Sequence, residues 1–339
     1  MLMKQIVISL VAALGVALVP PLAEASSVKH KPTATKTSKS KSATKHAKAS
    51  KAAKVQPVAA KKKIVPVARK AVPEASMAHE DTHHLVLQSS AALVQDQATG
   101  AVLFEKNAGA ILPIASISKL MTAMVTLDAK PNLQETMVIT DEDVDVLKGT
   151  RSRLKVGTQL PKEDMLRLAL MSSENRAAAA LSRYYPGGRP AFVAAMNRKS
   201  AALGLTGTHF EDSTGLTSAN VSTAKDLVRM VAAAHQYPLI REFTTTAEYE
   251  VNVTGRTETF RNTNPLVRSQ NQNDWEIGLS KTGYINEAGK CLVMQAWFNN
   301  KPTIIVLLDS WGKLTRIGDA NRIKRWIESA SVGHKTKAG

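Results

Sequence analysis

Cysteine is nearly absent from this chain of 339 residues, whose single copy is Cys291. One cysteine cannot form an internal disulfide, so the folded part of the chain must rely on its hydrophobic core. Cys291 lies in an expected strand, where we predict a small buried core residue. Tryptophan is also scarce, and we expect its four copies to pack against other side chains instead of stacking on a ligand: Trp275, Trp297, Trp311 and Trp326.

The apolar run near the N-terminus is too short to cross a bilayer comfortably. It spans residues 6–19, whereas a transmembrane helix needs about 20 apolar residues. Two prolines follow it, and Ala23-Glu24-Ala25 has the small residues typical of a cleavage site. We therefore predict a secretory signal peptide over residues 1–25 and an exported, periplasmic protein, with an uncleaved anchor and a buried core helix as alternatives.

Acidic and aromatic residues are both missing from residues 26–73, a segment of Lys, Ala, Ser, Thr, Val and Pro that carries 14 basic side chains. This composition cannot bury enough apolar surface to offset the entropy of ordering, so we predict a disordered, Lys/Ala-rich basic linker over residues 26–84. With Lys4, the segment holds 15 of the 45 basic residues, which leaves 30 basic against 28 acidic residues elsewhere. The net charge of +17 therefore belongs to this linker and says little about the folded domain.

The basic linker predicts an electrostatic partner. Because we expect the protein to be exported, we predict attachment to an anionic cell-wall polymer or membrane surface. Nucleic acid is the alternative partner for a lysine-rich segment. Export argues against nucleic acid, and the linker has no aromatic side chains among its lysines on which bases would stack. We therefore predict no nucleic-acid binding.

Residues 85–339 are numerous enough for one large catalytic domain or two intimate subdomains. Strand patterns occur at both ends and helical patterns lie between them, which predicts an α+β fold with a sheet subdomain over 85–140 and 248–339 and a helical subdomain over 141–247. The expected strands are 91–96, 101–106, 248–253, 278–285, 292–298 and 303–308. The expected helices are 111–130, 161–171, 190–203, 223–234 and 316–330.

The first motif is Ser116-Ile117-Ser118-Lys119, in which a lysine follows a serine by one helical turn. Positions three apart share a face of a helix. A serine hydroxyl needs a base to become a nucleophile, and a lysine serves as that base only when burial and positive neighbours lower its pKa. A helix N-cap is the alternative for Ser116. Only Ser116 opens an apolar helix after a hairpin, although the spacing recurs at Ser26, Ser38, Ser42, Ser152, Ser222 and Ser310.

The second motif is Ser173-Glu174-Asn175, which follows an apolar helical run at 165–171. A hydroxyl and an amide two residues apart at a helix end can point into one cleft. There the serine would relay a proton to a leaving nitrogen, and the amide would hold a substrate carbonyl. Loop polarity is the alternative, because the same pattern also begins at Ser218 and at Ser269.

The third motif, Lys281-Thr282-Gly283, lies inside the expected strand 278–285. Glycine in a strand often marks the close approach of a ligand backbone, and an edge strand can bind an extended peptide by adding it to the sheet. Lys281 supplies a charge and Thr282 a hydroxyl for a substrate carboxylate. A strand end with a β-bulge is the alternative.

The order of these motifs resembles that of the penicillin-recognising serine peptidases, which include β-lactamases and D-alanyl-D-alanine peptidases. Residues 113–123, Pro-Ile-Ala-Ser-Ile-Ser-Lys-Leu-Met-Thr-Ala, look like the nucleophile segment of the low-molecular-mass D-alanyl-D-alanine peptidases. Residues 171–177 and 185–188 resemble the endopeptidase members most closely, with Glu174 where carboxypeptidase relatives commonly have glycine. Further similarity lies at Phe210, Asp212, Gly215, Leu216, 222–226, 262–264 and 278–279.

This resemblance implies a β-lactamase-like fold, in which an antiparallel sheet is flanked by helices and joined to a helical subdomain. It implies a serine D-alanyl-D-alanine endopeptidase that hydrolyses peptide cross-links of peptidoglycan through an acyl-enzyme. β-Lactams would then be covalent inhibitors, and no metal or other cofactor would be needed. A D-alanyl-D-alanine carboxypeptidase is the alternative activity.

The resemblance also implies a role for each motif residue. Ser116 would attack the D-alanyl carbonyl and Lys119 would accept its proton. Ser173 would relay a proton to the leaving amine, while Asn175 positions the substrate. The strand Lys281-Thr282-Gly283 would bind the side of the substrate that bears the carboxylate. The backbone N–H groups of Ser116 and Tyr284 would form the oxyanion hole.

Two other enzyme classes compete with this interpretation. A β-lactamase must hydrolyse its acyl-enzyme quickly, and in one class this relies on a glutamate-held water. Glu174 lies inside the second motif and Glu211 lies in a stretch that matches peptidases, which argues against that class. A zinc peptidase is suggested by the spacing of His79 and His83, but no apolar helix holds them and no third ligand is evident.

Overall fold

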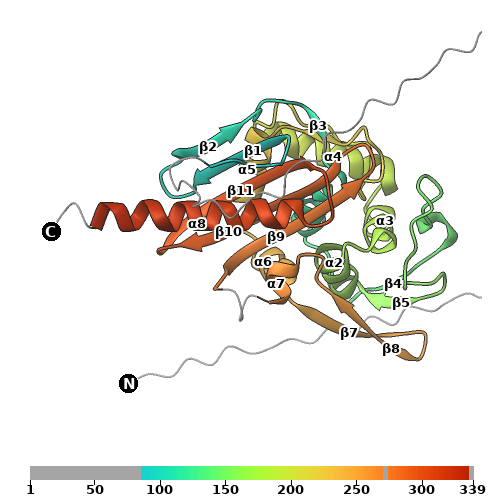
Figure 1. Ribbon diagram of the computed structural model, residues 1–339. Helices are drawn as coiled ribbons and strands as arrows, with labels where there is room; N and C mark the ends of the chain where they lie inside the picture. Colours follow the sequence, from blue (N-terminus) through green and yellow to red (C-terminus); the bar gives the residue numbers. More distant parts are fainter. Residues whose placement is uncertain (1–84, 270–273, 336–339) are drawn as a thin grey trace, which may run out of the picture. The chain divides into compact units, whose positions relative to one another are not determined.

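The computed structural model describes residues 85–269 and 274–335, with side chains described as far as residue 330. The predicted signal peptide, the basic linker and the 79–83 histidine segment lie outside these residues. A five-stranded antiparallel sheet, in the order β2-β1-β11-β10-β9, is the central element (Figure 1). Its strands are β1 (Ala91–Asp96), β2 (Val102–Lys106), β9 (Glu276–Ile285), β10 (Gly289–Phe298) and β11 (Lys301–Ser310).

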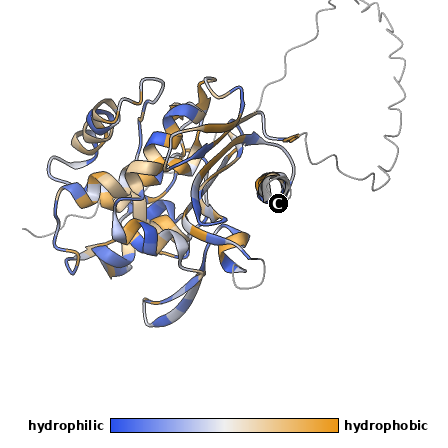
Figure 2. Ribbon diagram, turned by 90° about the vertical axis from the view of Figure 1, so that its left-hand side faces the viewer, coloured by the Kyte–Doolittle hydropathy of each residue, from blue (hydrophilic) through white to orange (hydrophobic). Residues whose placement is uncertain are grey.

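The sheet is apolar on both faces. In β11, Ile304, Val306 and Leu308 belong to one core, and Ile305 and Leu307 belong to the other. This division follows from the alternation of side chains along a strand. Helix α8 (Thr315–Lys335) packs on β10 and β11 over the second core, and Figure 2 shows this helix end-on beside the sheet. The sheet therefore separates α8 and the short helix α7 (Pro265–Arg268), whose Leu266 and Val267 belong to the second core, from the other helices.

The opposite face of the sheet carries the helical layer. Helix α5 (Ala224–Ala234) packs on β11 and β1, and α6 (Pro238–Thr245) packs on β9. Helix α1 (Lys119–Asp128) is buried along most of its length and contacts α2 (Lys162–Met171), α3 (Asn175–Arg183) and α4 (Gly188–Ala202). The short pairs β4 (Thr136–Val138) with β5 (Gln159–Pro161) and β7 (Glu248–Val253) with β8 (Arg256–Arg261), and helix α7 (Pro265–Arg268), complete the connections.

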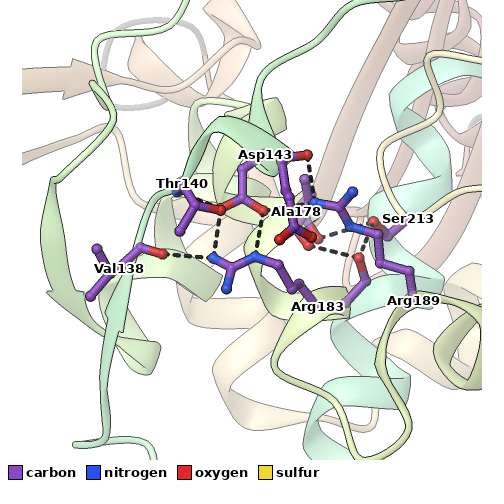
Figure 3. Close-up of polar contacts among 10 residues, drawn as sticks. Val138, Thr140, Asp143, Ala178, Arg183, Arg189 and Ser213 are labelled. Atoms are coloured by element: carbon purple, nitrogen blue, oxygen red, sulfur yellow. Dashed lines mark hydrogen bonds and ion pairs between the residues drawn. The ribbon is translucent and has the colours of Figure 1, made fainter. Parts of the chain in front are cut away.

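A buried carboxylate connects the segment after β4 to helices α3 and α4. Asp143 has no exposed side-chain surface and pairs with Arg183 of α3 at 2.7 Å and with Arg189 of α4 at 2.9 Å (Figure 3). Arg183 also donates a hydrogen bond to the carbonyl oxygen of Val138 in β4 at 2.7 Å. One carboxylate thus connects the segment after β4 to two helices, the first of which begins at Asn175.

The predicted helix over 111–130 is wrong at its start. Its first part forms strand β3 (Leu112–Pro113), which pairs with β6 (Val221–Ser222), and then a 3₁₀ helix, η1 (Ala115–Ser118). Pro113 has no N–H to donate to a helix. Ala115 has a φ of 49°, a left-handed conformation that interrupts a helix. Ser116 therefore lies in a tight turn before α1. The N-cap residue of η1 is Ile114, not Ser116.

The other predicted strands and helices are present, with ends that differ by a few residues, and the α+β fold class is confirmed. The further elements that were not predicted are short: β4, β5, β6, β8, α3, α6, α7 and the 3₁₀ helix η2 (Asp141–Asp143). None of the helices in the described ranges has the length and apolar character that a bilayer span requires.

Cys291 has no exposed surface, and burial raises the pKa of its thiol to about 11, so the prediction of a buried core residue is confirmed. The tryptophan prediction holds for Trp275, which is 5% exposed and stacks edge-on against Phe298 with ring centroids 5.5 Å apart. It is wrong for Trp311, which is 71% exposed between β11 and α8.

Candidate active site

Ser116 lies in η1, a turn that packs closely against two glycines. A Cβ atom at Gly215 would lie 2.0 Å from the carbonyl oxygen of Ala115. A Cβ atom at Gly283 of β9 would lie 2.7 Å from the carbonyl oxygen of Ile114 and 3.3 Å from the nitrogen of Ser116. The sequence suggested that a ligand backbone approaches Gly283, but the chain's own turn does so. This contact places the third motif directly against Ser116.

The amine of Lys119, the first residue of α1, is fully buried beside Ser116. Its Nζ lies 2.9 Å from Ser116 Oγ, 2.7 Å from Asn175 Oδ1 and 2.7 Å from the carbonyl oxygen of Thr214. Burial lowers the pKa of Lys119 to about 7, against two nearby carboxylates that raise it. A large fraction of this lysine is therefore a neutral amine at neutral pH, the form that accepts a proton.

The partners of Lys119 fix the direction of its lone pair. The Oδ1 of Asn175 and the carbonyl oxygen of Thr214 can only accept, so each must receive an N–H from Lys119. A neutral amine has two N–H groups, and its lone pair is then left facing the third partner, Ser116 Oγ. This arrangement is suited to removing the proton of the Ser116 hydroxyl.

The second motif lies where α2 ends and α3 begins, as predicted. Ser173 has a φ of 61°, in the left-handed region that a non-glycine residue adopts at a cost of about 1–3 kcal/mol. Its Oγ accepts a hydrogen bond from Lys281 Nζ at 2.9 Å. Since Asn175 contacts Lys119 and Ser173 contacts Lys281, the structure brings all three motifs together.

The Nδ2 end of the Asn175 amide, opposite the oxygen that contacts Lys119, is held by two further residues. Its Nδ2 donates a hydrogen bond to Thr150 Oγ1 at 3.0 Å. Thr150 Oγ1 in turn donates to Asp145 Oδ2 at 2.7 Å. Both Thr150 and Asp145 belong to the connection between β4 and β5, which the sequence did not suggest as part of the site.

The third motif lies on β9, as predicted, and presents positive charge to the site. The pKa of Lys281 is lowered well below its ordinary value, first by burial and then by the charges of Lys119 and Arg316. No carboxylate in the described part of the chain forms an ion pair with Lys281, so an anionic ligand bound beside it would raise its pKa. Thr282 Oγ1 donates to Thr263 Oγ1 at 2.6 Å. Tyr284, also on β9, is 55% exposed.

Glu174, the middle residue of the second motif, is held by a neighbouring loop. Its Oε2 accepts a hydrogen bond from Ser152 Oγ at 2.6 Å. Burial raises the pKa of this carboxyl, while the charges of nearby basic groups oppose the shift. Ser152 also begins one of the recurring serine–lysine spacings, and its contact with Glu174 gives it a structural role.

Arg316 of α8 is a site residue that the sequence did not indicate. Its Nη1 donates to the carbonyl oxygen of Gly283 at 3.0 Å, and its Nε is buried without a hydrogen-bond partner. Burial lowers the pKa of this guanidinium. Because Arg316 follows Gly283 by 33 positions and lies on the closing helix, only the packing of α8 on the sheet reveals their contact.

The other candidates lie away from the reacting groups. Asn220, from the second Ser-x-Asn pattern, is fully buried and donates to Ser118 Oγ at 2.9 Å, which is a structural contact. Residues 270–271 of the third pattern, which begins at Ser269, lie outside the described residues. No group of three or more His, Cys, Asp or Glu that could hold a metal ion occurs in 85–269 or 274–335.

With this geometry established, comparison with known proteins is informative. Peptidase family S11, described as D-alanyl-D-alanine carboxypeptidase, matches residues 76–312. The chain belongs to this family. Its sequence is 50% identical to the D-alanyl-D-alanine endopeptidase of Pseudomonas aeruginosa and 46% identical to that of Escherichia coli, in each case over 73% of this chain and 79% of the relative. The sequence-based assignment to the D-alanyl-D-alanine peptidases is confirmed.

Solved structures agree with the family assignment. The DD-transpeptidase of Streptomyces K15 superposes with a TM-score of 0.65 at 29% sequence identity. The match covers 71% of this chain and 97% of that protein. The predicted β-lactamase-like α+β fold, an antiparallel sheet flanked by helices, is therefore confirmed.

Proposed function

We propose that this chain is a serine D-alanyl-D-alanine endopeptidase that hydrolyses peptide cross-links of peptidoglycan through an acyl-enzyme on Ser116. The observation that carries the proposal is the 2.9 Å contact between Ser116 Oγ and the buried Lys119 amine, whose pKa is lowered to about 7. The similarity to two D-alanyl-D-alanine endopeptidases supports the endopeptidase activity over that of a carboxypeptidase.

Acylation begins when Ser116 Oγ attacks the carbonyl carbon of the scissile D-alanyl peptide bond. As the C–O bond forms, the hydroxyl proton moves to the lone pair of Lys119. The carbonyl oxygen becomes an oxyanion, which the backbone N–H groups of Ser116 and Tyr284 stabilise. Such donors are each worth about 3 kcal/mol in the transition state.

The tetrahedral intermediate collapses when the C–N bond breaks. The leaving amine takes a proton from Ser173 Oγ, and the proton that Lys119 took from Ser116 replaces it, so Lys119 becomes a neutral amine again. Ser173 Oγ accepts a hydrogen bond from Lys281 Nζ at 2.9 Å, which leaves its own proton free for this transfer. Lys119 then accepts a proton from water as that water attacks the acyl carbon. Hydrolysis releases the new carboxylate and returns the Ser116 hydroxyl.

Substrate positioning is assigned to residues around this centre. Asn175 holds the peptide through its amide, and the edge of β9 from Lys281 to Gly283 pairs with the extended peptide backbone. Lys281 and Thr282 bind a carboxylate that flanks the bond. Arg316 adds positive charge behind Gly283 through its hydrogen bond to the Gly283 carbonyl oxygen. The family resemblance requires no metal or other cofactor for these steps.

The remainder of the chain is assigned from its sequence. Residues 1–25 direct export, the basic segment 26–84 attaches to an anionic cell-wall polymer or membrane surface, and residues 85–339 form the catalytic domain. The site of action is the periplasm. Salt-sensitive sedimentation with cell-wall material that is lost when residues 26–73 are deleted would support the role of the basic segment.

The proposal is tested by mass spectrometry of the intact protein after incubation with benzylpenicillin. We expect one stable adduct on Ser116 that is absent from Ser116→Ala. The enzyme is then incubated with cross-linked muropeptides, whose conversion to monomers measures endopeptidase activity. Release of free D-alanine from uncross-linked pentapeptides without cleavage of dimers would identify a carboxypeptidase. Rapid turnover of the penicillin would identify a β-lactamase, and absence of any adduct would refute the proposal.

A further inference from the structure

A pocket of about 380 Å³ opens at the β9–β10 turn, where Tyr284, Lys290, Trp311 and Lys313 line it. None of the steps above uses its side chains. The volume lies in the lower part of the range of about 300–1,000 Å³ that is typical of small-molecule sites. Trp311, the most exposed tryptophan of the described residues, is one of the side chains that line this pocket.

This pocket lies beside the candidate active site, at the end of the same strand, β9. Tyr284 directly follows Gly283, which packs against the Ser116 nitrogen. Arg316, five positions after Trp311, donates to the carbonyl oxygen of Gly283 and so fixes the segment after β11 beside β9. A substrate bound at Ser116 along the edge of β9 therefore reaches the pocket where the strand ends, at Ile285.

The lining combines aromatic faces with amines. Trp311 is 71% exposed and Tyr284 is 55% exposed. Lys290 Nζ lies 4.1 Å from the centre of the Tyr284 ring. Within the described residues, neither Lys290 nor Lys313 forms an ion pair with a carboxylate. Both amines thus remain available as donors to a ligand.

These groups match the chemistry of a sugar ring. The C–H face of a pyranose is apolar and packs flat on an indole, while its hydroxyl, acetamido and carboxylate oxygens accept hydrogen bonds from amines. An extended peptide would pair with the edge of β9, but that edge ends where the pocket begins. The occupant is therefore a group attached beyond the extended part of the substrate.

On the basis of the proposed function, we infer that this pocket is a subsite for a saccharide ring of the glycan strand that carries the cross-linked peptide. Trp311 stacks on the sugar, and Lys290 and Lys313 donate to its oxygens. The subsite makes the enzyme prefer peptides that are still attached to glycan over free peptides.

The kinetic test uses the full chain and two substrates, a cross-linked dimer carrying its disaccharides and the same dimer after enzymatic removal of the sugars. We expect the wild type to favour the sugar-bearing dimer by about fivefold or more in kcat/KM, through a lower KM. Trp311→Ala should abolish this preference, and Trp311→Phe should retain most of it. Val102→Ala, which alters a half-exposed side chain on β2, is the matched control and should keep the preference. Equal kcat/KM values in the wild type, or an equal loss on both substrates in Trp311→Ala, would overturn the inference.

A binding test separates failure of this inference from failure of the proposed function. Peptide-free glycan oligosaccharides are titrated by calorimetry into the Ser116→Ala chain, in which no hydrolysis takes place. Saturable binding that is lost on adding Trp311→Ala, and kept with Val102→Ala, supports the subsite even if neither dimer is cleaved. Absence of binding at millimolar oligosaccharide refutes it. Binding of anionic lipid vesicles that depends on Trp311, without binding of oligosaccharide, would also refute it and would identify a membrane-facing surface.

Discussion

Thr150 sets which end of the Asn175 amide faces the catalytic lysine. Asp145 Oδ2 can only accept, so the Thr150 hydroxyl must donate its proton there, at 2.7 Å. Thr150 Oγ1 is then only an acceptor toward Asn175, and the atom that faces it at 3.0 Å must be Nδ2. The Oδ1 of Asn175 is consequently turned toward Lys119. Asp145 and Thr150 thus position the lone pair of Lys119 through Asn175.

Substituting Thr150 tests this positioning. In Thr150→Val the amide of Asn175 loses the acceptor that fixes its orientation, and we expect acylation by a fluorescent penicillin to slow about 10- to 100-fold, or about 1.4–2.7 kcal/mol in activation free energy. Thr150→Ser keeps the hydroxyl and should restore most of the rate. If the serine variant is as slow as the valine variant while both unfold at the wild-type denaturant concentration, Thr150 acts through packing instead.

The pH dependence of acylation should follow Lys119. Only the neutral amine accepts the Ser116 proton, and the pKa of Lys119 is lowered to about 7 by burial. The neutral fraction grows as pH rises, so the acylation rate at saturating β-lactam should increase from pH 5 to 9 with its midpoint near 7. Stopped-flow measurement of the first-order rate provides the profile. A rate that falls with pH over this range would contradict the assignment of Lys119 as the base.

Glu174→Gln tests whether the carboxylate of Glu174 influences the pKa of Lys119 and so the midpoint of the same pH profile. The charge of Glu174 raises the pKa of Lys119, so its removal should lower that pKa further. The midpoint of the acylation profile should then move to lower pH, while the hydrogen bond from Ser152 retains an acceptor oxygen at position 174. A midpoint that stays in place or rises would show that this carboxyl does not influence the base.

Gly283→Ala should impair catalysis more than folding. The added methyl group would lie 2.7 Å from the carbonyl oxygen of Ile114 and would push β9 away from the Ser116 turn. We expect at least about a tenfold loss of acylation rate, because small displacements of reacting groups have large effects on rate. Gly109→Ala is the matched control, since nothing lies within 4 Å of a Cβ atom there. Equal acylation rates in the two variants would refute the close-packing argument.

Asp143→Ala should reduce stability without changing the chemistry. Its carboxylate accepts hydrogen bonds from Arg183 and Arg189, and hydrogen bonds to charged groups are worth about 1.5–3 kcal/mol. The arginines are partly exposed and can turn to water, so we expect a loss of about 2–3 kcal/mol in the free energy of unfolding, measured with denaturant. Asp141→Ala, at an exposed position of the same turn, should change stability by less than about 0.5 kcal/mol. Similar losses in both variants would contradict the network in Figure 3.

Local patterns in the sequence predict the strands with buried apolar runs and the position of each motif on its element. They fail at the start of α1, where Ala115 adopts a left-handed conformation in a turn packed against Gly215, a residue 100 positions later. Contacts made through space have no local signal either. The acceptor role of Thr214 depends on a backbone carbonyl, which every residue possesses, and Arg316 reaches Gly283 only because α8 packs on the sheet.

The pairing of β1 with β11 has a consequence for biosynthesis. Ala91 of β1 lies opposite Leu308 of β11. More than 200 further residues must therefore be synthesised after β1 before its partner strand has been made. Lys281 and Gly283 are also supplied by this late part of the sheet. A growing chain therefore carries Ser116 and Lys119 long before it has Lys281 and Gly283, and the candidate active site stays incomplete until these late strands have been made.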